Sequence, residues 1–166
     1  MALTRKAHFA PIVAPGTRVL ILGSLPGEAS LAAARYYAHP QNRFWHLAGA
    51  VIRRDDLPTL DYEARLSTLR DAGVGLWDTI ASARRNGSLD AAIREVEPAL
   101  LAELVATLPL LRAVAFNGAT SARIGRRQLA VSNLALIDLP SSSPAYAAMP
   151  LAEKRARWLA LQQFLA

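Results

Sequence analysis

The run Val19-Leu20-Ile21-Leu22 constrains the fold more than any other segment, because it is apolar without interruption and stops at Gly23. A strand with one solvent-facing side alternates apolar and polar residues, whereas an unbroken β-branched and aliphatic run is typical of a strand covered on both faces. The segment 18–22 therefore predicts a central strand of a parallel sheet.

The rest of the chain alternates short apolar runs with helical patterns. Further strands are predicted at 74–77, 113–116 and 134–139. Helices are predicted at 30–35, 42–50, 61–72, 89–95, 98–108, 119–125 and 151–165. Strands separated by helices in this way imply right-handed crossovers and a sheet covered on both faces. The expected fold class is α/β, a three-layer α/β/α sandwich with a central, mainly parallel four-stranded sheet, in one domain over residues 1–166.

This topology also predicts where a ligand binds. In open parallel sheets, ligands lie beyond the carboxyl ends of the strands. The segments that follow the predicted strand ends are 23–42, 78–88, 117–118 and 140–150. We expect the functional site to be built from these segments.

Composition narrows the class of protein. The 166 residues are 52% apolar and include no cysteine, which excludes disulfides, thiolate metal sites and cysteine nucleophiles and fits a reducing cytoplasm. No apolar run approaches the roughly 18 residues of a membrane span, and residues 1–15 lack the apolar core of a signal peptide or an anchor. The formal net charge of +6 favours polyanionic partners, although basic enzymes that bind no nucleic acid are common.

The first candidate motif is Gly23-Ser24-Leu25-Pro26-Gly27, directly after the first predicted strand. Two glycines and a proline make a tight turn whose backbone can approach a flat ligand closely. The motif lacks the lysine of a phosphate-binding loop and the spacing of a dinucleotide-binding loop. An ordinary strand-to-helix turn explains the same residues, because glycine and proline punctuate many loops.

The second candidate motif runs from Tyr36 to Trp45 and gathers aromatic rings, His39, Asn42 and a guanidinium within ten residues. Aromatic rings stack on nucleobases, and an asparagine hydrogen-bonds a base edge or holds a water molecule. Helix capping is the alternative explanation for Asn42. We expect Phe44 and Trp45 to lie in the core and not to face a ligand.

The third candidate motif, residues 139–146, follows the last predicted strand and reads Leu-Pro-Ser-Ser-Ser-Pro-Ala-Tyr. Prolines and hydroxyl residues at a strand end give a stiff loop with several hydrogen-bond donors, which can grip phosphates. A surface loop with an incidental serine run is the alternative.

Taken together, the three motifs resemble those of the uracil-DNA glycosylase superfamily. Residues 74–93 and the segment Ala115-Phe116-Asn117-Gly118 resemble the hypoxanthine-DNA glycosylase branch in particular. The resemblance extends from about residue 16 to residue 146. It implies the fold class given above and a base-excision-repair enzyme without metal or cofactor, which hydrolyses the N-glycosidic bond of a deaminated base in DNA, with hypoxanthine favoured.

One departure from the superfamily pattern concerns Leu25. Much of the superfamily has Asn or Asp at this position, where the side chain positions the attacking water. A leucine side chain can neither accept a proton nor orient a water molecule. The nearest replacement is Asn42, and the hypoxanthine branch is thought to use an Asn in this second segment. The resemblance therefore assigns catalysis to Asn42 and argues against an efficient general uracil glycosylase.

The resemblance also implies roles around the base. Backbone groups of Gly23, Ser24 and Leu25 would read the base edge, Tyr37 would stack on the flipped base, and Asn117 would bind it. His39 and Asp78 are second-rank candidates, and helix capping explains Asp78 equally well.

The DNA backbone would be gripped by the third motif. Pro140, Ser141, Ser142 and Ser143 would pinch it, and Tyr146 or Ala145 would fill the space that the flipped nucleotide leaves. Five arginines are expected to face phosphates or solvent: Arg84, Arg85, Arg123, Arg126 and Arg127.

Neither Lys6 nor Lys154 follows a predicted strand end, so we expect a monofunctional enzyme without lyase activity. The expected partner is DNA containing a deaminated base, and we expect a cytoplasmic monomer that contacts no membrane. Three alternatives remain open: a mismatch-specific uracil or thymine glycosylase, a catalytically silent DNA-binding module of the same fold, and an α/β enzyme that acts on free nucleosides.

Overall fold

The computed structural model describes residues 5–166 and contains the predicted four-stranded parallel sheet. Its strand order is β3-β2-β6-β7, and the three neighbouring pairs are all parallel. The strands are β2 (Val19–Gly23), β3 (Val74–Asp78), β6 (Ala113–Asn117) and β7 (Ala135–Leu139). Residues 1–4 of the segment predicted to be neither signal peptide nor anchor lie outside the described residues.

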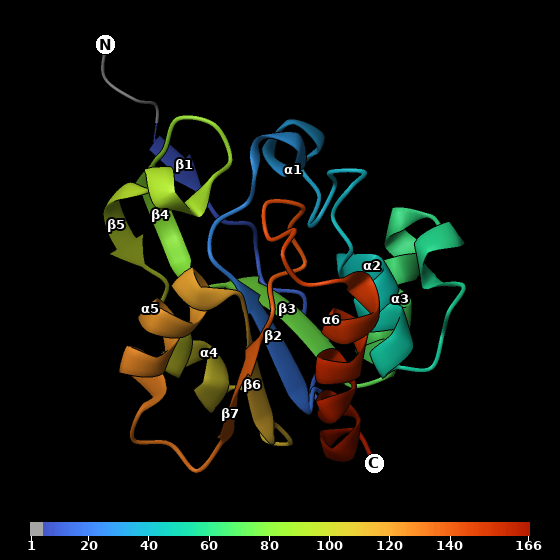
Figure 1. Cartoon of the computed structure of the whole chain (residues 1–166). Coiled ribbons are helices and arrows are strands. Elements are labelled where there is room, and N and C mark those ends of the chain that lie inside the picture. The colour runs from blue at the N-terminus through green and yellow to red at the C-terminus, as the bar shows by residue number, and fades with distance from the viewer. Residues whose placement is uncertain (1–4) are drawn as a thin grey trace.

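Helices cover both faces of this sheet, which confirms the three-layer α/β/α prediction (Figure 1). One face carries α2 (Phe44–Val51), α3 (Tyr62–Asp71) and α6 (Leu151–Trp158). The other carries α4 (Leu101–Ala106) and α5 (Ala119–Leu129). A short helix, α1 (Glu28–Ala33), follows the Gly23–Gly27 turn at the carboxyl edge of the sheet. Single-turn 3-10 segments lie at Leu57–Thr59 and Asp90–Ala92, and a longer one at Leu159–Phe164 follows α6.

An apolar core lies on each face of the parallel sheet, which explains why the β2 sequence is apolar throughout. Val19 and Ile21 pack into the core beneath α2, α3 and α6, whereas Leu20 and Leu22 pack into the core beneath α4 and α5. All four side chains have no exposed surface. A polar residue at any of these positions would therefore be buried against helices.

A second, antiparallel sheet was not predicted. Its order is β1-β4-β5, with β1 (Arg5–Ala7), β4 (Ile80–Arg84) and β5 (Arg94–Pro98). The prediction of a helix at 89–95 was wrong, because only Asp90–Ala92 forms a helical turn and β5 follows. Pro98 ends β5 and does not open the next helix, which begins at Leu101. Pairing with β4 overrides the weak local helix preference of these residues.

Candidate active site

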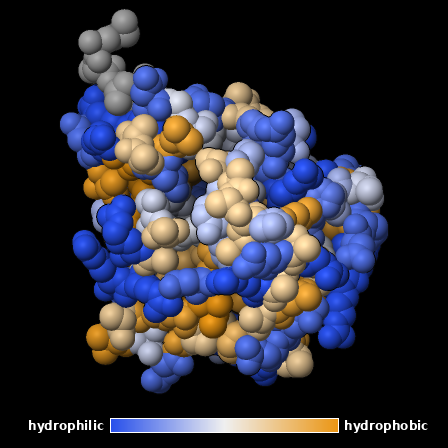
Figure 2. All heavy atoms as spheres, viewed as in Figure 1, coloured by the Kyte–Doolittle hydropathy of each residue, from blue (hydrophilic) through white to orange (hydrophobic). Residues whose placement is uncertain are grey.

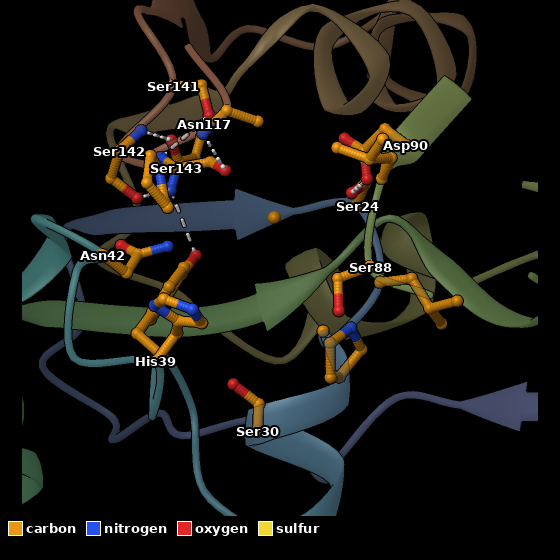
Figure 3. A pocket seen from close by; sticks show the side chains of 18 of the residues that line it. Ser24, Ser30, His39, Asn42, Ser88, Asp90, Asn117, Ser141, Ser142 and Ser143 are labelled. Carbon is orange, nitrogen blue, oxygen red and sulfur yellow. Dashed lines mark hydrogen bonds between the residues drawn. The ribbon is translucent and has the colours of Figure 1, made fainter. Parts of the chain in front are cut away.

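A cavity of about 540 Å³ opens at the carboxyl ends of the parallel strands. It collects side chains from segments that lie far apart in the sequence (Figure 3). The predicted residues that line it are Gly23, Ser24, Leu25, Tyr37, His39, Asn42, Asp78, Asn117, Ser141, Ser142, Ser143 and Tyr146. Pro140 is not among the lining residues, and its carbonyl oxygen accepts a hydrogen bond from Trp158 Nε1 at 2.9 Å. In Figure 3, His39 and Asn42 lie on the same side as Asn117 and the serine loop (residues 140–146), opposite Ser24 and Asp90.

Gly23 allows two polar side chains to meet at the floor of this cavity. It stands opposite Asp78 in the register of β2 and β3. A Cβ atom on Gly23 would lie 2.6 Å from Asp78 Oδ1 and 3.2 Å from the Tyr37 hydroxyl. Only glycine leaves room for this approach, so the first motif is more than an ordinary turn.

Asp78 is a buried carboxyl with an unused oxygen. Its residue is 4% exposed, and among residues 5–166 its Oδ2 has no hydrogen-bond partner. Burial raises the pKa of Asp78 to about 7; the Asp90 carboxylate also raises it, and Arg85 opposes the shift. The capping alternative for Asp78 was wrong, because strand β4 and not a helix follows it.

Residues 88–91 form the wall opposite Asn42, and Arg85 precedes them in the same loop. Arg85 is 1% exposed and donates hydrogen bonds to the carbonyl oxygens of Gly87 at 2.8 Å, Leu25 at 3.5 Å and Pro26. The prediction that Arg85 faces phosphate or solvent was therefore wrong. These bonds tie the first motif to the loop, so Arg85 positions the cavity wall.

Two side-chain contacts brace the same wall. The Ser24 hydroxyl donates to Asp90 Oδ1 at 2.7 Å, and the Ser88 hydroxyl accepts from the Glu28 backbone N–H at 2.8 Å. Burial raises the pKa of Asp90, and the hydrogen bond from Ser24 opposes that shift. Asp90 thus places a second carboxyl in the cavity wall.

The backbone of the first motif is partly occupied. The carbonyl oxygens of Gly23 and Ser24 accept hydrogen bonds from the N–H groups of Thr79, at 2.8 Å, and Ile80, at 3.1 Å, and that of Leu25 accepts from Arg85. The carbonyl groups of this turn are therefore already engaged within the protein.

Tyr37 is held in a strained conformation at the cavity. Its φ of 51° lies in the left-handed region, which is uncommon for an aromatic residue. Trp45 Nε1 donates to its carbonyl oxygen at 3.1 Å, and its ring stacks on Phe44 with centroids 3.8 Å apart and planes 8° apart. One face of the Tyr37 ring is thus already covered. Phe44 and Trp45 are buried, which confirms that they belong to the core.

Asn42 combines a structural contact with an open donor. Its Oδ1 accepts a hydrogen bond from the Phe44 backbone N–H at 2.9 Å, which satisfies a free amide at the start of α2. This bond fixes the amide so that its NH₂ group turns into the cavity (Figure 3). The neighbouring Arg43 N–H donates to the Ser142 carbonyl oxygen at 3.0 Å, which joins the second motif to the third.

His39, at the rim of the cavity, has one ring nitrogen engaged, because its Nδ1 accepts from the Gln41 backbone N–H at 3.1 Å.

Asn117 uses both ends of its amide on the protein. Its Nδ2 donates to the Ser142 hydroxyl at 2.9 Å and to the Tyr37 hydroxyl at 3.3 Å, and its Oδ1 accepts from the Ser142 N–H at 2.9 Å. Asn117 therefore positions the serine loop and the Tyr37 ring. Its predicted contact with a base stays a prediction.

The serine loop keeps donors for a ligand. Ser141 Oγ accepts from the Ser143 N–H at 3.1 Å, and Ser143 Oγ accepts from the Ala145 N–H at 3.2 Å. Because both hydroxyls act as acceptors here, their own protons remain available. Tyr146 is 42% exposed at the end of this loop, with Lys154 Nζ 5.2 Å from the centre of its ring.

The remaining predicted arginines lie outside the cavity. Figure 2 shows a hydrophilic band at the level of α5, the helix that carries Arg123, Arg126 and Arg127. Arg126 pairs with Asp138 at 2.9 Å, and Arg84 pairs with Glu95. Across residues 5–166, no group of three or more metal-ligating side chains is arranged to hold an ion. None of the helices in this part of the chain has the length and apolar character needed to cross a membrane.

The sequence and the fold of the chain are similar to those of known proteins. The model of the Uracil DNA glycosylase superfamily matches residues 10–164. Proteins named Hypoxanthine DNA glycosylase from Methanosarcina barkeri and Methanosarcina acetivorans are 39% and 38% identical over 117 and 113 residues, which are 70% and 68% of this chain and 73% and 71% of theirs. A solution NMR structure from Methanosarcina acetivorans, described as a candidate uracil DNA glycosylase, superposes with a TM-score of 0.87 at 33% identity and covers 98% of this chain and 99% of its own.

Proposed function

Because the chain belongs to the uracil DNA glycosylase superfamily, we propose that it hydrolyses the N-glycosidic bond of a deaminated base in DNA, with hypoxanthine as the favoured base. The reaction would release the base and leave an abasic site, which opens base excision repair. The observation that carries this proposal is the cavity, where an asparagine amide, an aromatic ring, a buried carboxyl and a hydroxyl loop converge.

The target atom of a base is inaccessible within a duplex, so the nucleotide must first leave the base stack, at a cost of a few kcal/mol. In this proposal the hydroxyls of Ser141 and Ser143 bind the phosphates beside the extruded nucleotide. The exposed ring of Tyr146 fills the space left in the stack, as apolar side chains do in proteins that bend DNA. A deaminated base pairs weakly, which lowers the cost of extrusion and favours damaged nucleotides.

Inside the cavity, Asn42 acts on the leaving base. As the bond breaks, positive charge develops on the sugar and negative charge develops on the base. The Asn42 NH₂ group is fixed by the contact of its oxygen with Phe44, so it donates without reorganisation. The open face of Tyr37 stacks on the base, opposite the face that Phe44 covers. Leu25 is 6% exposed and contributes only apolar surface, which is why the polar role passes to Asn42.

Two observations support hypoxanthine over a general uracil preference. The two relatives cited above are named for hypoxanthine, and Leu25 replaces the side chain that positions water in much of the superfamily. Neither Lys6 nor Lys154 lines the cavity, so we propose a monofunctional enzyme without lyase activity. We further propose that it acts as a monomer.

The test is a panel of DNA duplexes that carry hypoxanthine, uracil, xanthine or a thymine mismatch, incubated with excess enzyme. We expect the fastest release from the hypoxanthine duplex, measured as strand cleavage after alkali. Release of uracil or thymine alone would support the mismatch enzyme. Salt-sensitive DNA binding without release of any base would support the silent module, and hydrolysis of free inosine would support the nucleoside enzyme.

Replacing Gly23 by alanine should reduce base release about 10²-fold, because displacing catalytic groups by about 1 Å has an effect of this size. The new methyl group would lie 2.6 Å from Asp78 Oδ1, closer than Cβ atoms come to neighbouring atoms in real proteins. It must therefore displace the carboxyl or the Tyr37 ring. Single-turnover rates measure the effect.

Gly27→Ala is the matched control in the same turn. Its φ is −73°, and its Cβ would make an ordinary 3.4 Å contact with Ser88 Oγ, so activity should stay close to that of the natural chain. Equal activity of the Gly23 and Gly27 variants would show that the close approach at Gly23 does not matter.

A further inference from the structure

The carboxyl of Asp78 is not used by the mechanism described so far. It lines the cavity, is 96% buried, and among the described residues its Oδ2 has no hydrogen-bond donor. A buried ionised oxygen without a donor is costly, whereas a protonated carboxyl in the same place is neutral. These surroundings therefore favour the acid form of Asp78.

Of the charged groups around Asp78, Asp90 favours the acid form and Arg85 opposes it. Asp90, across the cavity wall, places a like charge near it. Arg85 is the nearby cation, and three carbonyl oxygens occupy its guanidinium. Tyr36 and Tyr37 lie on the second motif, where burial raises the pKa of their hydroxyls, so they stay neutral.

We propose that Asp78 is the general acid of the reaction, and that it delivers its proton to an unsubstituted ring nitrogen of the leaving purine. This inference rests on the proposed glycosylase function. It assigns a catalytic role at the end of β3, distinct from the donor role of Asn42. The role suits a purine, because a purine ring has further basic nitrogens besides the one bonded to the sugar.

The proton and electron balance closes within one turnover. The glycosidic C–N bond breaks and its electron pair stays with the base, while the Asp78 proton binds the base, which departs neutral. The oxygen of water forms the new bond to the sugar carbon, and the proton that this water loses restores the Asp78 carboxyl. The products are the free base and the abasic sugar, with no net proton change.

The acidity of Asp78 suits this role, because a general acid works best when its pKa lies near the working pH. With a pKa of about 7, Asp78 holds its proton in much of the population at neutral pH. The proton is present below this value and is lost as the pH rises through it. Base release that depends on this proton must therefore fall above about pH 7.

The experiment is the single-turnover rate of hypoxanthine release from a duplex, measured between roughly pH 5 and pH 9. The natural chain should lose about tenfold in rate for each pH unit above the midpoint. Asp78→Asn keeps the size of the side chain but has no acidic proton, so its rate should be about 10²- to 10⁴-fold lower at pH 6 and no longer fall with pH.

Asp90→Asn is the matched variant for the electrostatic argument. It keeps an acceptor for the Ser24 hydroxyl but removes the neighbouring charge, so the midpoint should move to lower pH while the slope stays. A merely structural role of Asp78 would leave the slope unchanged in Asp78→Asn.

A rate that is flat or rises through pH 7 in the natural chain overturns the inference, even if the Asp78 variant fails to fold. A rising rate would mean that the ionised carboxylate accepts a hydrogen bond from the base. These results leave the proposed function standing. If the natural chain releases no base at any pH, the proposed function fails and the inference fails with it.

Discussion

Asn42→Ala is expected to lower the rate of hypoxanthine release by at least about tenfold, and by about 10²- to 10³-fold if one transition-state donor is lost completely. The variant removes the NH₂ group that the contact with Phe44 holds toward the cavity. DNA binding should persist, because the serine loop and the basic surface are unchanged. Single-turnover kinetics and a separate binding titration measure the two properties.

Asn42→Asp separates catalysis from the structural contact at the start of α2. Aspartate accepts the Phe44 N–H as well as asparagine does, but it has no NH₂ group to donate. We expect it to be as slow as Asn42→Ala and to unfold at the temperature of the natural chain. If Asn42→Asp keeps full activity while Asn42→Ala does not, the side-chain oxygen is the important atom and the donor assignment is wrong.

The position of the site could be predicted from the sequence because one rule governs it. The apolar run of β2 requires a sheet covered on both faces, and in such a sheet the segments after the strands meet at one edge. This rule brings Gly23, Asn42, Asn117 and the serine loop together, although 120 positions separate Gly23 from Ser143. The resemblance to the superfamily predicted the role of each residue, and the sheet topology predicted that these residues lie close together.

The segment 78–88 was expected near the site, but the contacts that Arg85 and Asp90 make there could not be predicted, because they leave no local pattern in the sequence. Arginine is a residue type usually found at the surface, and Arg85 is buried only because carbonyl oxygens from the first motif accept its hydrogen bonds. Asp90 enters the cavity because it begins a 3-10 turn that leads into β5, which pairs with β4, whereas helix propensity predicts a helix over 89–95. Asp78 was recognised as a candidate, but its unusual acidity depends on these same unpredicted neighbours.

The second large effect concerns stability and links the core to the serine loop. Trp158, near the end of α6, has no exposed surface. Its ring packs edge-on against Phe44, with centroids 5.8 Å apart, and its Nε1 donates to the Pro140 carbonyl oxygen at 2.9 Å. Phe44 in turn supports the ring of Tyr37. A single buried indole thus supports the aromatic stack below the cavity and the first residue of the loop above it.

Trp158→Ala should therefore reduce the free energy of unfolding by about 3–5 kcal/mol, the usual cost of emptying a buried aromatic site. For a chain of this length, roughly 2–4 °C per kcal/mol gives a loss of about 6–20 °C in melting temperature. Trp158→Phe keeps most of the ring but leaves the Pro140 carbonyl oxygen without its hydrogen bond, which should reduce the free energy of unfolding by about 1–3 kcal/mol. Val131→Ala, at a fully exposed side chain, should stay within about 0.5 kcal/mol. If Trp158→Ala has the same melting temperature as the Val131 control, α6 does not hold the site together. If Trp158→Phe has the same melting temperature as Trp158→Ala, the hydrogen bond to the loop matters more than the packed ring.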